Sequence, residues 1–175
     1  MLRKTRDRWE FDSELALENF VWANLEGIFG LTALERQYNC SGEICDIIAV
    51  DREGRLVVIE LKNCEDRYIA QQLTRYYHNL LSEKPFHFQV NYSLPARLIA
   101  VAPSFDRHNL VDRIYNRLEL QFLSFDILHF EHTFYFLLKD LDTLEDCKIE
   151  IPYKLVNTFD LSKDIPAPPQ VLLNY

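Results

Sequence analysis

Two carboxylates and one lysine stand at positions where they could act together on a phosphate ester. Asp46 lies in the apolar run 44–50, and Glu60 and Lys62 end a second apolar run, 55–62. The turn sequence DREG separates the two runs, which predicts an antiparallel hairpin. Cross-strand partners that sum to about 106 place Asp46 opposite Glu60, with the side chain of Lys62 on the same face because strand side chains alternate.

This arrangement predicts a cation site. Two carboxylates that face each other across a strand pair repel unless a positive charge lies between them. Mg²⁺ or Mn²⁺, which prefer oxygen ligands, would remove that repulsion. Such an ion can act as a Lewis acid on a phosphate and lower the pKa of a bound water, while Lys62 orients the water or stabilises developing charge. The chemistry this predicts is metal-assisted hydrolysis of a phosphodiester.

Position distinguishes this motif from a chance match. An acid, any residue and a lysine in a row are expected roughly once in a chain of this length, and charged strand ends are usually solvated. Here the strand before Glu60 is apolar on both faces from Leu56 to Ile59. Such strands are central and buried, and buried charges need a partner or a metal.

The surrounding periodicity predicts a mixed sheet with helices on its faces. Asp12 and Ser13 can begin a helix from Glu14 to about Gly27, closed by Gly27 or Gly30. Asn63 can cap a second helix. The remaining expected elements are that helix at 65–81, a strand at 97–103, a helix at 105–118, strands at 120–128 and 133–138, and a proline-containing arm over the last two dozen residues.

The hairpin and the helix after it resemble a known family. GEICDIIAVDREGRLVVIELK followed by AQQLTRYY is similar to the core motif of the PD-(D/E)XK nuclease superfamily, in its RecB and NucS-type branch, and the likeness runs from Ser13 to Tyr77. It implies a restriction-endonuclease-like, three-layer α/β/α domain with a mixed central sheet over 1–145. Residues 146–175 are then an extension or arm, part of the same domain or an oligomer contact. The implied activity is a metal-dependent endonuclease that hydrolyses DNA.

The resemblance also implies roles for single residues. Asp46 and Glu60 hold Mg²⁺ or Mn²⁺, and Lys62 assists the attacking water. Three further groups complete the implied catalytic and metal-binding set: Glu14, the backbone carbonyl of Leu61, and Gln72. Structural explanations remain open for two of these assignments. Glu14 could be an acid favoured at a helix N-terminus, and Gln72 with Tyr76 could be a packing pair. Cys45 stands where the superfamily name has proline.

Charge limits the expected mode of DNA binding. The net charge of −8 argues against a non-specific nucleic-acid coat protein. Residues 1–125 hold 15 basic and 18 acidic side chains, so a local basic surface is compatible with the composition. The predicted nucleic-acid contacts are Arg6, Arg8, Gln37, Arg67, Arg75 and Tyr76, with plain solubilising charge as the alternative for the arginines. No residue separates DNA from RNA as the substrate.

Other signals in the chain are weaker. No apolar run is long enough to span a membrane, and the basic start of the chain continues into acids, so we expect a cytoplasmic protein. Four cysteines without a paired spacing predict ordinary thiols. His129 and His132 fall on opposite faces of a strand. The rival function is an inactive nuclease-fold module that binds nucleic acid or a protein, with the C-terminal arm as a docking or homo-oligomer contact.

Overall fold

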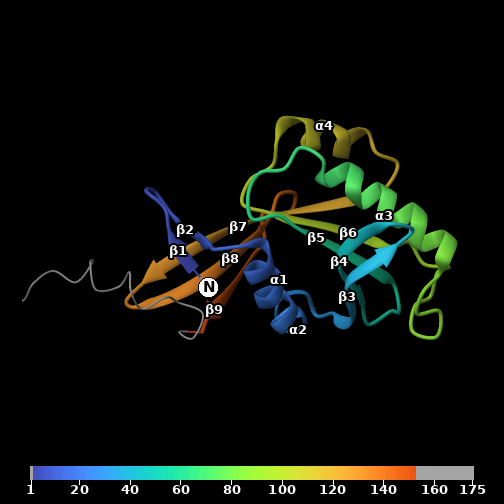
Figure 1. Ribbon diagram of the computed structural model, residues 1–175, viewed down its shortest axis with the longest axis horizontal. Helices are drawn as coiled ribbons and strands as arrows, with labels where there is room; N and C mark the ends of the chain where they lie inside the picture. The colour runs from blue at the N-terminus through green and yellow to red at the C-terminus, as the bar shows by residue number, and fades with distance from the viewer. Residues whose placement is uncertain (1, 153–175) are drawn as a thin grey trace, which may run out of the picture.

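A nine-stranded mixed sheet runs through residues 2–152, which are the residues that the computed structural model describes (Figure 1). Along the sheet the order is β1-β2-β7-β6-β5-β4-β3, and β8 and β9 continue from β7. The strands are β1 Leu2–Lys4, β2 Trp9–Phe11, β3 Thr32–Cys40, β4 Glu43–Val50, β5 Leu56–Leu61, β6 Arg97–Ala102, β7 Leu120–Phe130, β8 Thr133–Asp140 and β9 Asp146–Ile151. The helices are α1 Glu14–Ala23, α2 Leu25–Phe29, α3 Ile69–Glu83 and α4 Arg107–Tyr115.

Strand β5 is the centre of the sheet, and all of its residues are buried. It pairs antiparallel with β4, where Ile47 lies opposite Ile59 and Ile48 opposite Val58. This confirms the predicted hairpin and its register. On its other side β5 is parallel to β6, which is parallel to β7. The predicted mixed sheet is therefore present, and β5 and β6 end at the same edge.

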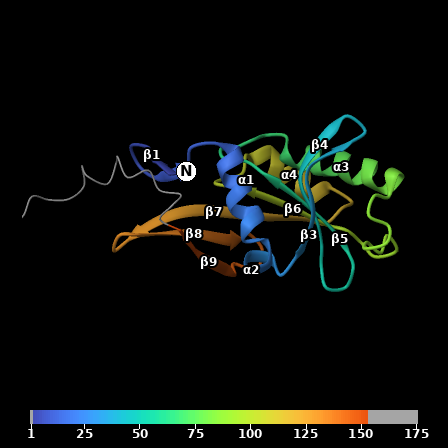
Figure 2. The same ribbon diagram turned by 60° about the horizontal axis from the view of Figure 1, so that its bottom comes forward.

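Each face of β5 packs against its own group of helices. On one face, Val57 and Ile59 join a core that includes Leu17 of α1. On the other face, Val58 joins a second core that includes Leu73 of α3. Figure 2 shows α3 and α4 together on one side of the sheet and α2 on the other. These layers confirm the predicted α/β/α fold class.

The first predicted helix is shorter than expected because the chain breaks at Asn24. Ser13 caps α1, since its Oγ accepts a hydrogen bond from the amide of Ala16 at 3.1 Å. The short helix α2 then follows and ends at Gly30, whose φ of 65° is a left-handed conformation that glycine adopts at little cost. The predicted N-terminus and glycine stop are confirmed, but a single helix to Gly27 is wrong.

The second helix begins later than predicted, and Asn63 is not its cap. The residue before α3 is Tyr68, which makes no capping hydrogen bond with its side chain. Asn63 Nδ2 instead donates to the backbone carbonyl of Phe11 at 2.7 Å. The cap prediction fails because the polar side chain after β5 is used to hold another strand. This contact fixes β2 beside the end of β5.

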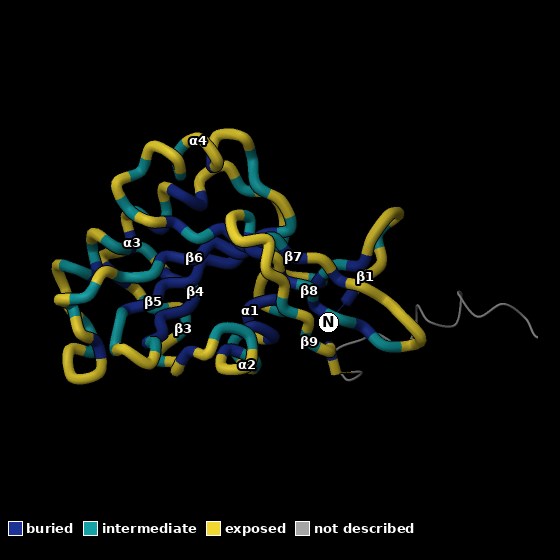
Figure 3. Tube along the Cα trace, turned by 180° about the vertical axis from the view of Figure 1, so that it is seen from behind, coloured by how far each residue is buried: buried dark blue, intermediate teal, exposed yellow. Residues whose placement is uncertain are grey.

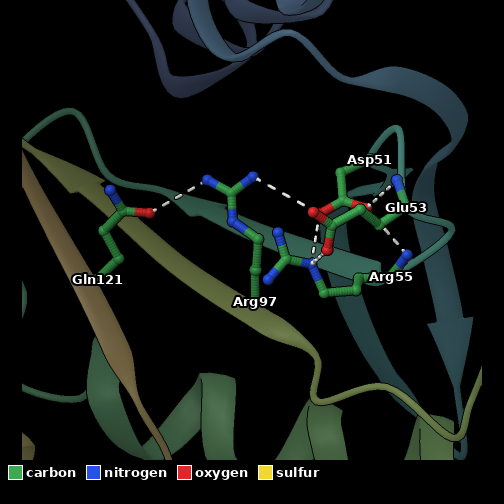
Figure 4. A network of polar contacts seen from close by, with 5 residues as sticks. All are labelled: Asp51, Glu53, Arg55, Arg97 and Gln121. Carbon is green, nitrogen blue, oxygen red and sulfur yellow. Dashed lines mark hydrogen bonds and ion pairs between the residues drawn. The ribbon is translucent and has the colours of Figure 1, made fainter.

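The opposite end of β5 carries a balanced polar network (Figure 4). Asp51 accepts hydrogen bonds from the Arg55 amide at 3.0 Å and from Arg55 Nε at 2.7 Å, and Arg97 contacts Gln121. Burial would raise the pKa of Asp51, but these hydrogen bonds outweigh it and lower that pKa. Charges at this end are therefore matched, which is not the case where β5 ends.

The predicted C-terminal extension, residues 146–175, is only partly described by the structure. Its first residues form β9, which pairs antiparallel with β8, for example Phe136 with Ile149. Residues 153–175, which include most of the predicted arm, lie outside the described residues. Within the described part of the chain, no helix is long and apolar enough to cross a membrane.

Candidate active site

Asp46 and Glu60 meet at the end of the β4–β5 hairpin, as the register requires. The backbone amide of Leu61 donates to Asp46 Oδ2 at 2.8 Å, and Lys62 Nζ lies 2.8 Å from Glu60 Oε1. Glu60 is only 1% exposed, and the side chain of Lys62 is 14% exposed. The structure therefore brings the two predicted carboxylates and the predicted lysine into one buried group.

The group formed by Asp46, Glu60 and Lys62 has an excess of negative charge that a bound cation would neutralise. Burial and then the charge of Asp46 raise the pKa of Glu60 to about 8, against the opposing effect of Lys62. Burial also raises the pKa of Asp46, although the Leu61 amide opposes it. For Lys62, burial lowers the pKa, but Glu60 outweighs it and the net shift is upward. All three shifts favour a bound positive charge.

The donor set fits a hard divalent cation. Glu60 Oε2 is buried and has no hydrogen-bond partner among residues 2–152. The N–H and C=O of a strand residue point to the same side, so the carbonyl of Leu61 lies, like its amide, on the side of β5 that faces β4. Within the described chain, no three His, Cys, Asp or Glu side chains already form a metal cluster. A Mg²⁺ ion here would rely on two carboxylates, one carbonyl, and water or phosphate oxygens.

A hollow of about 340 Å³ opens beside Asp46. It is lined by Glu14, Leu15, Glu18, Gln37, Asp46 and Leu61. Glu14 is exposed in the first turn of α1, and its Oε1 accepts a long 3.4 Å hydrogen bond from the amide of Asn63. Glu14, Gln37 and Leu61, which were predicted from the resemblance, thus lie together with Asp46.

Glu18 is a site residue that the sequence reasoning missed. It is 4% exposed, and its two oxygens accept from Arg36 Nε and Gln37 Nε2, both at 2.6 Å. Gln37 Nε2 also contacts Asp46 Oδ1 at 3.3 Å. One signal could have found Glu18, because it follows Glu14 by four residues and so shares its helix face. Gln37 therefore joins two carboxylates of the hollow.

Gln72 and Tyr76 lie on α3, which packs on the face of β5 that carries Val58. Tyr76 is 3% exposed, and burial followed by the charge of Glu60 raises the pKa of its hydroxyl. It packs in the second core, which agrees with the packing alternative. Gln72 Oε1 is buried without a hydrogen-bond partner among the described residues. This pair is not part of the hollow beside Asp46.

The predicted basic contacts lie outside the hollow. Arg75 Nε pairs with Glu43 Oε1 at 2.5 Å, so its charge is matched within the chain. Arg67 is exposed above the ring of Tyr68. Arg6 and Arg8 are exposed in the turn between β1 and β2. None of these four arginines contacts the carboxylate group directly.

The weaker sequence signals have structural explanations. His129 stacks on Phe134, with 4.3 Å between ring centroids, so it does not form a cluster with His132. Most of the aromatic residues of β7 and β8 are buried core, although Phe130 is exposed. The four cysteines are free thiols, and Cys40 and Cys45 lie 3.3 Å apart at their sulfur atoms.

A comparison with family models identifies the site-bearing region. Residues 13–108 match the model described as the endonuclease NucS C-terminal domain, which is more than half of the chain. The chain belongs to the NucS C-terminal domain family. The match contains α1, the β4–β5 hairpin and α3, and so every side chain of the carboxylate group.

Solved structures of NucS-like proteins share this fold. One is EndoMS in a complex with double-stranded DNA, with 25% identity, a TM-score of 0.51 and coverage of 64% of this chain and 44% of that chain. Another is a repair endonuclease from Pyrococcus abyssi, with 28% identity and a TM-score of 0.50. The match covers 65% of this chain and 47% of that chain. The chain thus spans less than half the length of these relatives. Its NucS-like core is shared, whereas β1, β2 and β7 to β9 lie outside the matched residues 13–108.

Proposed function

We propose that this NucS-like chain hydrolyses phosphodiester bonds in DNA through a PD-(D/E)XK site that binds Mg²⁺ or Mn²⁺. The observation that carries the proposal is Glu60, a buried carboxylate with an unpartnered oxygen beside Asp46 and with Lys62 at 2.8 Å. A carboxylate buried at such cost is typical of a functional site. Membership in the NucS family supports the same reaction class.

Each residue of the group has a role that follows from its position. Asp46, Glu60 and the carbonyl of Leu61 would hold the ion, and Glu14 stands at the rim of the hollow to bind its water shell. When bound, the ion supplies Lewis-acid catalysis and makes water more acidic. Lys62 presents an ammonium group whose orientation is fixed by Glu60, so it can donate to the attacking water or to a phosphate oxygen.

Two more residues support the site from its sides. Gln37 donates to both Glu18 and Asp46, which holds the Asp46 carboxylate in one orientation. Gln72 offers a buried, unpartnered carbonyl oxygen on α3, and we assign it to the positioning of water on that side of the sheet. Arg67, exposed in the segment after Lys62, is the proposed phosphate contact there.

DNA is the proposed substrate because a NucS-like relative is described in complex with double-stranded DNA. The test is cleavage of end-labelled single-stranded, duplex, flap and mismatched DNA with Mn²⁺ and Mg²⁺, and of the matching RNAs. Wild type should cut at least one DNA substrate, whereas Glu60→Gln should not. If neither protein cuts and Mn²⁺ leaves the melting temperature unchanged, the chain is a binding module that has kept the nuclease fold.

A further inference from the structure

The hairpin formed by β1 and β2 lies outside residues 13–108 and yet is attached to the site. Trp9 of β2 pairs with Ile127 in the part of β7 that extends beyond β6. The carbonyl of Phe11 accepts the 2.7 Å hydrogen bond from Asn63, the residue after Lys62. In Figure 1 the hairpin is the blue pair of strands beside β7 and α1. The pairing holds the hairpin against β7, and the hydrogen bond places its Phe11 end next to the end of β5.

The hairpin is held firmly by its inner face. Leu2 and Phe11 are buried in the core, and the Phe11 ring packs against Phe20 with centroids 5.6 Å apart. Trp9 contacts Phe134 edge-on, with centroids 4.7 Å apart. The turn at the other end of the hairpin is exposed, as the yellow trace beside β1 in Figure 3 shows. The side chains of this turn are therefore held in a fixed position relative to the core.

What the turn presents is positive charge. Residues 2–11 contain four basic side chains and two acidic ones, in a protein whose net charge is −8. Glu10 is satisfied by Arg3 at 2.8 Å and lies 3.7 Å from Arg8. Arg6 is exposed and forms no side-chain hydrogen bond or ion pair with another residue of the described chain. Arg8 lines a small hollow together with Asn63, the residue after Lys62, and with the acidic Glu10 and Asp126.

We propose that the β1–β2 hairpin binds the phosphate backbone of the nucleic acid and holds it beside the Asp46–Glu60–Lys62 group. This inference rests on the proposed nuclease function. The hollow itself is acidic, since Glu14, Glu18 and Asp46 line it, and it repels a polyanion. A fixed basic surface on the hairpin, which is joined to the site through the Asn63–Phe11 contact, offsets that repulsion. Arginine is well suited to phosphate because its planar fork can donate two hydrogen bonds.

Salt-dependent DNA binding tests the hairpin separately from catalysis. The affinity of a labelled duplex is measured in EDTA from 50 to 200 mM salt for wild type, Arg6→Ala and Arg8→Ala. The matched control is Arg52→Ala, an exposed arginine in the turn at the opposite end of β5. Each hairpin variant should weaken binding and reduce the slope of log K against log salt by about 0.9, the value for one lost phosphate contact. Arg52→Ala should match wild type.

The outcomes separate the two proposals. If Arg6→Ala and Arg8→Ala behave like Arg52→Ala, or if wild type does not bind at 50 mM salt, the hairpin inference is overturned, whether or not wild type cleaves DNA with Mn²⁺. If the slopes change as expected but wild type cleaves nothing, the nuclease proposal fails and the hairpin remains a phosphate-binding surface. Unchanged melting temperatures of the variants would show that the effects do not come from unfolding.

Discussion

The backbone amide of Leu61 donates a 2.8 Å hydrogen bond to Asp46 Oδ2, so the strand that carries Glu60 also holds the opposing carboxylate. This contact gives Asp46 a structural role beside its proposed role as a metal ligand. The two roles make opposite predictions for substitutions that keep or remove the acceptor oxygen. The contribution of the charge can therefore be measured separately from that of the hydrogen bond.

Asp46→Asn should abolish cleavage, by on the order of 100-fold or more, because it removes a ligand charge. It keeps an oxygen that accepts from Leu61 and relieves repulsion with Glu60, which offsets the loss of the 3.3 Å contact with Gln37, so the metal-free protein should melt near the wild-type temperature. Asp46→Ala should lose the same activity and melt at a lower temperature. Its free energy of unfolding should fall by about 1 kcal/mol, because the hydrogen bond from Leu61 is no longer made. Thermal melts in EDTA and single-turnover cleavage check this. A strongly destabilised Asp46→Asn would indicate a purely structural residue.

The stability of the metal-free protein should fall as pH rises from about 4.5 to about 8. Glu60 has a pKa of about 8 in the fold and an ordinary value of 4.5 when unfolded, so across this window the folded state binds more protons. The loss should be on the order of a few kcal/mol. Urea unfolding in EDTA at several pH values measures it. Glu60→Gln should remove most of the decline, and parallel profiles for the two proteins would contradict the assignment.

Mn²⁺ should raise the melting temperature of wild type, and more at pH 8 than at pH 6. The ion must displace the proton that Glu60 holds below pH 8, so binding is weaker at the lower pH. At a concentration of about 100 times the dissociation constant, the gain is about 2.7 kcal/mol. Glu60→Gln should lose the effect. Glu53→Gln removes an exposed carboxylate at the far end of β5 and should retain it, so equal responses in both variants would disprove the site.

The β4–β5 hairpin could be predicted from sequence because two independent signals agree on it. The polar turn sequence DREG marks where the chain reverses, and the apolar residues on both sides of the strand require burial on both faces. Asp46 and Glu60 then follow from register alone. Glu14 and Gln37 were assigned to the site from the resemblance. The periodicity of the sequence does not predict how close they lie to Asp46.

The missed strands lack those signals. In β3, the residues from Thr32 to Asn39 are exposed or half-exposed and only Cys40 is buried, so the apolar pattern of a buried strand is missing. Strands β1 and β2 have three residues each, too few to show a period. Glu18 was missed because its partners, Arg36 and Gln37, come from β3. Contacts between distant segments of the chain are not visible in local periodicity.

Arg36→Met should destabilise the protein by about 1–3 kcal/mol, because it leaves the buried Glu18 carboxylate without its charged partner. The same variant leaves the hollow more negative, so it should bind Mn²⁺ more tightly than wild type. Adding Glu18→Gln should restore most of the lost stability and cancel the gain in affinity. A double-mutant cycle on urea unfolding and Mn²⁺ titration measures both couplings. If the two substitutions are additive, Glu18 and Arg36 do not act as a pair, and the hollow owes none of its charge balance to them.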